Sequence, residues 1–448
     1  MSAPAPASAP PRTGRAYAEA AGLVVALALM AAAMLVPELA GWHVHVRSFP
    51  PLHAAWMPRV GPGTLPALAL GVLAAWRAVP LAASLSWPRL LLAAYGVGLA
   101  WMLALAVVDG RDGIGVVLES KYEYLRTARV TDDLPAALAA YVDRIPFSAG
   151  DQRWPPHLAG HPPGALTFFV LLARLGLGGG FAAGIVVTLF AASTAVAVLV
   201  TLRALGAEEM ARRAAPFLVV GPAAIWQCVS ADGMFAAYAA WGLAALAVAS
   251  VRRSLAWSVV AGLLLGWCVM LSYGLPLLGI LALAVLWLGG SWKPLLPTAL
   301  AAAAVVLVFA AYGFAWWEAI GVLHDRYWDG VARNRPASYW MWGNLAALLF
   351  SAGPMLGAGL ARAAASARRL SGDAQARVVL ALVGASAAAV AVADLSRMSK
   401  AEVERIWLPF APWLLLSCAL LPVRWRRAGI VVQVATALVV QHLLKPDW

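Results

Sequence analysis

Long apolar runs follow one another along almost the whole chain of 448 residues. A helix needs about 20 mostly apolar residues to cross the hydrocarbon core of a bilayer, and runs of about this length recur from residue 17 onward. Only 12% of the residues are charged, about half the share in a soluble globular domain. Because backbone groups inside a bilayer must be paired within their own segment, the sequence predicts an all-α protein, a polytopic transmembrane helical bundle.

The apolar runs divide the chain into about thirteen predicted spans. In chain order these are residues 17–40, 64–76, 90–108, 181–202, 214–229, 235–251, 255–271, 275–288 and 296–316, one that returns toward Arg362, then 378–393, 407–421 and a last one before the C-terminus. The run at 164–175 is too short to cross, so we expect a re-entrant or interfacial helix there. A full crossing would put the arginines of "LRALGAEEMARR" on the extracytoplasmic side, against the usual distribution of positive charge.

The arginines fall mainly in short loops between spans, and this arrangement predicts the orientation in the cell membrane. Cytoplasmic loops carry the excess of Lys and Arg, so the N-terminus is expected in the cytoplasm. Two polar loops, residues 109–163 and 317–340, are then extracytoplasmic, and the first is expected to carry short helices. Residues 1–16, rich in Pro and Ala, predict a disordered cytoplasmic tail, and residues 17–448 form one transmembrane domain. The same arginines account for the net charge of +12, so we expect no nucleic-acid partner.

Acidic residues concentrate in the polar loops and at the ends of spans. They are Asp109, Asp112, Glu119, Glu123, Asp132, Asp133, Asp143, Asp151, Asp232, Glu318, Asp325, Asp329, Asp394, Glu402 and Glu404. A proton-coupled transporter usually places ionisable groups near the middle of the bilayer. The distribution instead favours an enzyme that works at the extracytoplasmic surface.

Three segments of the sequence carry a family resemblance. A polar loop opens with Asp109 and closes with "GHPPGALTFFVLLARLG"; a lone acid, Asp232, separates two spans in "IWQCVSADGMFAAYAAWGLAAL"; and Arg405 precedes a Leu-Pro-x-x-Pro span in "SKAEVERIWLPFAPWLLLSCALL". In this order the segments resemble the GT-C superfamily of membrane glycosyltransferases, whose donors are polyprenyl-phosphate sugars. Gly164 departs from the family's usual His-Pro-Pro-Leu.

Two further departures concern the phosphate contacts and the loop order. Ser272 and Tyr273 stand where the family often carries a Lys that is expected to contact the phosphate. In addition, the large loop follows the third predicted span, whereas in the family it usually follows the first.

The resemblance implies a GT-C-like fold and an extracytoplasmic, inverting transfer of a sugar from a polyprenyl-phosphate donor to a cell-envelope acceptor. A carboxylate would take the proton of the acceptor hydroxyl, and the first acid after the span is favoured for this role. The catalytic candidates are therefore Asp109 and Asp112. The resemblance also assigns substrate-binding roles, which fall to Asp232, Glu404, Arg405, His161 and Lys400. Membrane lipid and the lipid-linked donor are the implied partners.

Each of these residues also has a purely structural interpretation. Asp109 is equally well read as part of a turn at a helix end, and Asp112 as a solvated loop residue. Asp232 fits the N-cap of a helix that begins at Gly233, a common use of Asp. Glu404 and Arg405 fit an interfacial ion pair that anchors a span.

Cofactors stay open at this stage, and so do two other functions. Histidines and carboxylates of the loops offer a divalent metal site, but without a third ligand in register we assign no metal ligand. We expect His161 to tie the first polar loop to the short helix that follows it. The alternatives to a glycosyltransferase are a transporter or flippase for a lipid-linked substrate, and a non-catalytic membrane subunit of an envelope-assembly complex.

Overall fold

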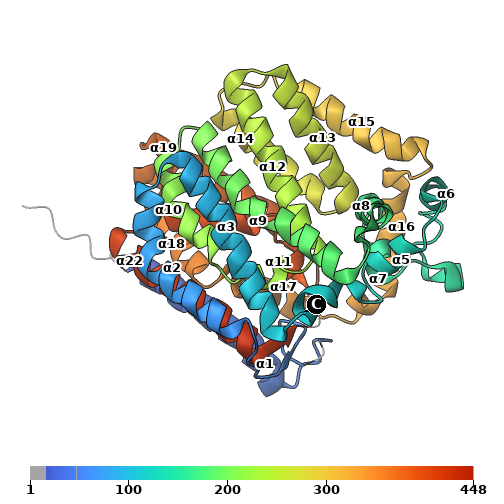
Figure 1. The fold of residues 1–448 in the computed structure, drawn as a ribbon, viewed down its shortest axis with the longest axis horizontal. Coiled ribbons are helices and arrows are strands. Elements are labelled where there is room, and N and C mark those ends of the chain that lie inside the picture. Colours follow the sequence, from blue (N-terminus) through green and yellow to red (C-terminus); the bar gives the residue numbers. More distant parts are fainter. Residues whose placement is uncertain (1–16, 47, 447–448) are drawn as a thin grey trace, which may run out of the picture.

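A computed structural model describes residues 17–46 and 48–446, and the predicted tail at 1–16 lies outside the described residues. The prediction of an all-α protein is confirmed. The longer helices are α1 (Ala18–Ala40), α2 (Thr64–Ser84), α3 (Trp87–Ala106), α8 (Gly164–Leu172), α9 (Gly180–Ala204), α10 (Glu208–Val219), α12 (Ala231–Arg252), α13 (Leu255–Leu271), α14 (Leu278–Leu288), α15 (Leu295–Ala311), α16 (Trp316–Asp329), α17 (Ala337–Ala352), α18 (Met355–Leu370), α19 (Ala374–Leu395) and α22 (Val423–Leu443). They pack side by side as one bundle (Figure 1).

Shorter elements fill the connections. They are α4 (Asp112–Gly115), α5 (Leu125–Arg129), α6 (Leu134–Ala139), α7 (Pro156–Gly160), α11 (Ala224–Gln227), α20 (Val403–Ile406), α21 (Ala411–Leu415) and two antiparallel strands, β1 (Ala54–Trp56) and β2 (Leu444–Pro446). Four of these helices lie in the polar loop 109–163, which therefore carries short helices as expected from the sequence.

Six helices of the described chain are long and apolar enough to cross a membrane: α1, α2, α3 with the turn that follows it, α9, α12 and α19. The number rises to eight if two bent pairs each count as one span, namely α15 with α16 (bent by 75°) and α17 with α18 (bent by 107°). The protein is thus all-helical with six to eight candidate membrane spans, fewer than the thirteen predicted. Five predicted spans do not qualify even when each bent pair counts as one span. Helices α10, α13 and α14 have 12, 17 and 11 residues and fall short of the length needed to span unaided, and neither the segment at 407–421 nor α22 is among the candidates.

Two predicted spans have different limits in the structure. The second was expected to end near Trp76, but α2 continues to Ser84, with Pro80 inside the helix. The span predicted at 214–229 begins earlier, at Glu208, where Arg212 forms an ion pair with Glu208 at i, i+4. Residues 208 and 212 are neighbours on one face of α10, and their ion pair stabilises the helix in the turn that precedes its apolar part.

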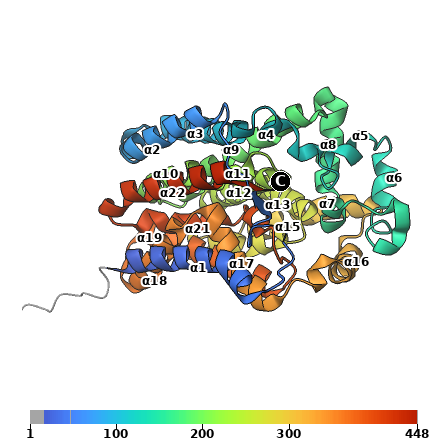
Figure 2. The ribbon, with the colours of Figure 1, turned by 90° about the horizontal axis from the view of Figure 1, so that it is seen from below.

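The polar segments gather at one end of the bundle. Figure 2 shows α4 to α7 and α16 at the end opposite the start of α1. The C-terminal strand lies at the same end, where β2 pairs with β1 and Arg59 donates a hydrogen bond to the carbonyl of Leu444 (2.9 Å). The two ends of the described chain therefore lie at opposite ends of the bundle (Figure 2). The short helix α8 stays beside α5 at the polar end (Figures 1 and 2).

Arginines hold the helix ends together on the opposite side of the bundle. Arg212 on α10 donates hydrogen bonds to the carbonyls of Ala82 (3.1 Å) and Leu85 (2.7 Å) at the end of α2. Arg362 on α18 pairs with the buried Glu19 of α1 (3.3 Å).

The break between α17 and α18 is stabilised by a buried amide. Gln433 on α22 donates to the carbonyl of Ala352 (2.7 Å) and accepts from the backbone N–H of Met355 (3.4 Å). These are the backbone groups that the break leaves without helical partners, and apolar surroundings require such groups to be satisfied. The chain between them passes through Gly353 in the left-handed region (φ 84°).

Candidate functional site

Arg405 lies at the centre of a buried ion cluster at the polar end of the bundle. It belongs to the short helix α20, just before the apolar residues 407–421, and its side chain is only 4% exposed. Its guanidinium lies 3.2 Å from the Glu123 carboxylate, 2.8 Å from His157 Nε2 and 3.7 Å from Asp232 Oδ2. Four segments far apart in the sequence thus converge on one charge.

His157 and Glu123 form a pair whose protonation follows from their partners. His157 Nε2 accepts a hydrogen bond from Arg405, which is always a donor, so this nitrogen carries no proton. His157 Nδ1 lies 3.0 Å from Glu123 Oε1 and therefore donates to the carboxylate. Glu123, His157 and Arg405 close a triangle in which every contact joins a donor to an acceptor.

The electrostatics of the cluster favour the ionised forms of both main partners. Burial by itself raises the pKa of Glu123, but His157 and Arg405 outweigh burial and lower that pKa to about 2. Burial lowers the pKa of Arg405, yet Asp232, Glu123 and Glu402 raise it above its ordinary value. Opposite charges at these distances stabilise one another strongly where water is excluded.

Asp232 faces the cluster and does not cap a helix. Helix α12 begins at Ala231, two residues earlier than the sequence suggested, and Ser230 is its N-cap: the Ser230 hydroxyl accepts from Gly233 N–H at 3.1 Å. The N-cap interpretation of Asp232 is therefore wrong. Because Ser230 satisfies the helix end, the buried Asp232 carboxylate is available to Arg405.

Asp109 and Asp112 lie in different surroundings. Asp109 ends the turn after α3, and its carboxylate lies 2.8 Å from Arg59 Nε with a side chain that is 24% exposed. Asp112 is exposed at the start of α4. The described contacts join Asp109 to Arg59 and none of them joins it to Arg405. Asp232 and Arg405 thus come together, whereas Asp109 forms a separate ion pair.

The remaining predicted residues surround the cluster. His161 Nδ1 lies 2.8 Å from the carbonyl of His157, and its ring lies between Tyr124 and Phe235. Burial lowers the pKa of His161 below its ordinary value. Glu404 is buried within α20. The Lys400 ammonium donates to the carbonyls of Ala332 (3.1 Å) and Arg335 (3.0 Å), so it ties the second polar loop to the segment before α20.

Several residues of the cluster were not singled out from the sequence. Glu123 is one of many acids of the first polar loop, and His157 is one of the loop's histidines. Arg335, in the second polar loop, is 8% exposed and lies 3.8 Å from Glu402, which in turn lies 3.6 Å from Arg405. No local motif marks these residues, because each acquires its partner only through packing.

Among residues 17–46 and 48–446, no group of three or more His, Cys, Asp or Glu side chains could hold a metal ion. The reason is visible in the cluster, where Arg405 stands between the carboxylates and histidines as their shared partner.

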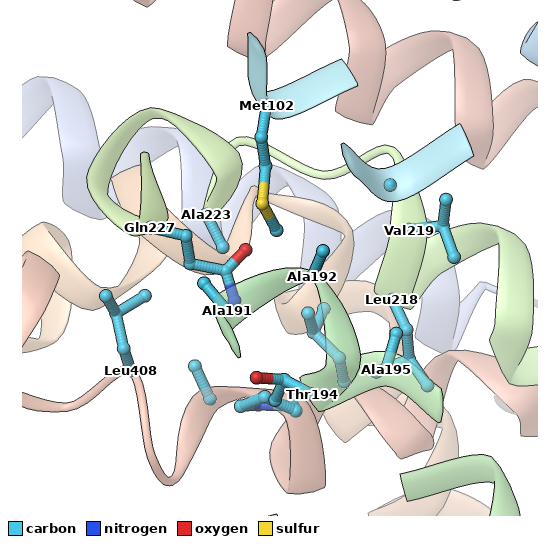
Figure 3. A pocket seen from close by; sticks show the side chains of 14 residues that line it. Met102, Ala191, Ala192, Thr194, Ala195, Leu218, Val219, Ala223, Gln227 and Leu408 are labelled. Carbon is cyan, nitrogen blue, oxygen red and sulfur yellow. The ribbon is translucent and has the colours of Figure 1, made fainter. Parts of the chain in front are cut away.

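A small cavity is lined in part by residues that lie near Asp232 and Arg405 along the chain. Figure 3 shows Gln227, Thr194, Met102 and Leu408 around it, on the segments that lead to Asp232 and away from Arg405. The space open to the centre of a water molecule is about 20 Å³, which suits about one water and is too small for a sugar or a lipid chain.

A wider hollow of about 540 Å³ lies between residues 128–132 and 170–179. Arg129, one of its lining residues, is bound by both carboxylate oxygens of Glu119. None of the residues that line these two spaces belongs to the ion cluster.

The fold and the cluster define the class of the protein as a multi-pass helical membrane protein with a buried ionic centre at one end. No family model matches the sequence, and no curated protein matches it.

Proposed function

We propose that the protein is an extracytoplasmic glycosyltransferase of the cell envelope, of GT-C-like architecture, that uses a polyprenyl-phosphate-linked sugar as donor. The observation that carries the proposal is the convergence of Glu123, His157, Asp232 and Arg405 at one end of an apolar helical bundle. A lipid-linked donor needs apolar surroundings for its chain and cations for its phosphate. Arginine suits phosphate because its planar fork binds two oxygens at once.

The reaction has a simple balance of bonds and protons. The acceptor hydroxyl oxygen forms a bond to the anomeric carbon, and the bond between that carbon and the phosphate oxygen breaks with inversion. Asp109 takes the proton of the hydroxyl, and the polyprenyl phosphate leaves with the electron pair, stabilised by Arg405. Asp232, 3.7 Å from Arg405, orients the acceptor.

The loop at residues 41–63 supports a joint role for Asp109 and the cluster. Arg59 of this loop pairs with Asp109, and His53 of the same loop contacts Arg335, which is linked to Arg405 through Glu402. Six residues of chain span at most about 20 Å, so one short stretch connects both groups.

The thirteen-span topology belongs to the same proposal. Helices that are too short to cross alone, such as α13 and α14, then cross in a locally thin or protein-lined part of the membrane. The polar end, with the two polar loops and the C-terminus, faces the extracytoplasmic side, and the start of α1 faces the cytoplasm.

The test is sugar transfer from a radiolabelled polyprenyl-phosphate sugar into envelope material by membranes that contain the full-length protein. Asp109→Asn should abolish transfer without lowering the amount of protein, and Asp143→Asn, an exposed acid of the same loop, should leave transfer unchanged. Arg59→Gln breaks the same ion pair as Asp109→Asn, so a smaller loss in Arg59→Gln would separate proton transfer from structural support. Unchanged transfer in both Asp109→Asn and Asp112→Asn would refute the mechanism.

A second function is favoured by one observation, the bend of 107° between α17 and α18. Discontinuous helices are typical of transporters for which the break forms part of the substrate path. Movement of a labelled polyprenyl-phosphate lipid across proteoliposome membranes, without sugar transfer, would support transport and exclude the enzyme.

A further inference from the structure

Glu402 lies between two buried arginines without reaching hydrogen-bond distance to either. Its Oε1 lies 3.8 Å from Arg335 NH2, and its Oε2 lies 3.6 Å from Arg405 NH2. Charge-assisted hydrogen bonds between a guanidinium and a carboxylate are about 2.7–2.9 Å long. The carboxylate is therefore attracted by both arginines but fits neither closely.

The two arginines have matching surroundings. Arg335 NH2 lies 3.0 Å from His53 Nε2, and Arg405 NH2 lies 2.8 Å from His157 Nε2. The other terminal nitrogen of each guanidinium donates to an oxygen, that of the Lys400 carbonyl for Arg335 (2.6 Å) and that of Glu123 for Arg405 (3.2 Å). The terminal nitrogens of each arginine thus contact one histidine and one oxygen, and each NH2 group also lies toward Glu402.

Arg335 carries a donor that nothing satisfies among the residues that the structure describes. Its Nε is buried and has no hydrogen-bond acceptor, and the side chain as a whole is only 8% exposed. Leaving a buried donor of a charged group without an acceptor is unfavourable. The donor therefore marks a place where a further acceptor oxygen would bind.

The backbone at Glu402 is strained and its side chain is the accessible member of the group. Ala401 and Glu402 both adopt left-handed conformations (φ 75° and 64°), which are unfavourable for residues with a side chain,. Such strain concentrates at ligand sites and switches. The side chain of Glu402 is 24% exposed, whereas those of Arg335 and Arg405 are 8% and 4% exposed.

We propose that Arg335 and Arg405 form a two-arginine binding site for a phosphate group, and that the Glu402 carboxylate holds the position that the phosphate oxygens take. A tetrahedral phosphate presents more oxygens than a planar carboxylate, so it satisfies both NH2 groups and Arg335 Nε together. The polyprenyl monophosphate that leaves in the proposed reaction is a phosphate monoester and carries about −1.5 to −2 charges at pH 7, against one for Glu402. The site deepens the proposed function and rests on it for the identity of the phosphate as a lipid headgroup.

The test is equilibrium binding to the purified full-length protein in detergent micelles, with two probes: a polyprenyl monophosphate and inorganic phosphate. Glu402→Gln removes the competing negative charge and should tighten binding by about tenfold, since an opposite charge within this distance shifts an ionic equilibrium by about that factor or more. Arg335→Gln should weaken binding by a similar factor. Glu318→Gln and Arg333→Gln alter exposed residues of the second polar loop and should change nothing.

The two probes separate the sources of the phosphate. Binding of the polyprenyl monophosphate alone indicates a lipid headgroup, and equal binding of inorganic phosphate indicates a site for free phosphate. Equal affinity in the wild type, Glu402→Gln and Arg335→Gln overturns the proposal. If Glu402→Gln does not fold, Glu402→Asp is the second variant, because its shorter side chain keeps the negative charge but moves it away from the two arginines. Glu402→Asp should bind the phosphate probe more tightly than the wild type. An affinity at or below the wild-type value overturns the proposal.

The outcome for this site is independent of the outcome for the enzyme. Sugar transfer that depends on Asp109, with phosphate affinity unaffected by Glu402 and Arg335, would leave the proposed function standing and reject the site. The expected changes in affinity, without sugar transfer in any preparation, would keep the site and reject the enzyme.

Discussion

The guanidinium of Arg405 lies 3.2 Å from the carboxylate of Glu123, although 282 positions separate the two residues in the chain. Both side chains are almost fully buried, at 4% and 2% exposed. A buried ion pair of this kind is weak evidence for stability, but the loss of one partner leaves an uncompensated buried charge. The pair therefore makes the connection between the first polar loop and α20 dependent on both residues.

Replacement of Arg405 by Met should destabilise the protein by about 3–5 kcal/mol, because Glu123 and Asp232 lose their shared cation in a buried site. The expected result is a markedly lower unfolding temperature in detergent. Arg126→Met removes an exposed arginine that lies close to Glu123 in the sequence. It serves as the control and should leave the unfolding temperature unchanged. Equal unfolding temperatures of the wild type and Arg405→Met would contradict the central role of this residue.

The stability of the folded protein should fall in acid because of Glu123. Its pKa is about 2 in the folded state, against an ordinary value of 4.5, so the unfolded chain takes up a proton first as pH falls. The stabilisation, on the order of 3 kcal/mol, is fully present above about pH 4.5 and is lost as pH falls toward 2. Unfolding measured from pH 7 to pH 3 should show a steeper loss for the wild type than for Glu123→Gln. Parallel pH profiles of the two proteins would refute this assignment.

Gln433→Leu should cost about 1–3 kcal/mol, because the carbonyl of Ala352 and the N–H of Met355 lose their partner in apolar surroundings. The measurement is the unfolding temperature in detergent. Gln441 lies on the same helix and is also buried, yet its amide makes no hydrogen bond to the rest of the described chain. Gln441→Leu should therefore have a smaller effect, and the reverse order of the two variants would reject the role given to Gln433.

Helices α1 and α18 should tolerate no side chain at their closest approach. A Cβ added to Gly357 would clash with the carbonyl oxygen of Gly22, and a Cβ added to Gly22 would clash with the carbonyl oxygen of Gly357. Small residues allow helix backbones in membranes to approach in this way, so Gly357→Leu should destabilise by roughly 1–3 kcal/mol. Gly384 on α19 has open space around it, and Gly384→Leu is the control. Similar unfolding temperatures for both variants would show that the contact is not needed.

The periodic and local parts of the fold were predictable. Apolar runs gave the positions of most long helices, and the short run at 164–175 indicated a short helix, which the structure has at Gly164–Leu177. The limits of α2 and α10 were wrong because Arg77, Glu208 and Arg212 continue helices beyond the apolar stretch. A hydropathy pattern cannot separate the end of a helix from the end of its apolar part.

The sequence predicted that Asp232 and Arg405 belong to one substrate-binding site, and the two side chains are in contact. It also treated Asp109 as part of the same group, while the structure pairs Asp109 with Arg59. Glu123 and Arg335 carried no signal of their own, because a carboxylate or an arginine in a polar loop is ordinarily solvated. Whether Asp109 and Asp112 act in catalysis stays a prediction.

The sequence by itself determined that the chain is a bundle of apolar helices with its acidic residues in loops, because a bilayer demands paired backbone groups and apolar side chains over each crossing. Only the tertiary structure decided which charges meet. The contacts of Arg405 with Glu123, His157, Asp232 and Glu402 join positions up to 282 residues apart. Such contacts depend on how helices pack against one another, which local patterns of hydrophobicity do not specify.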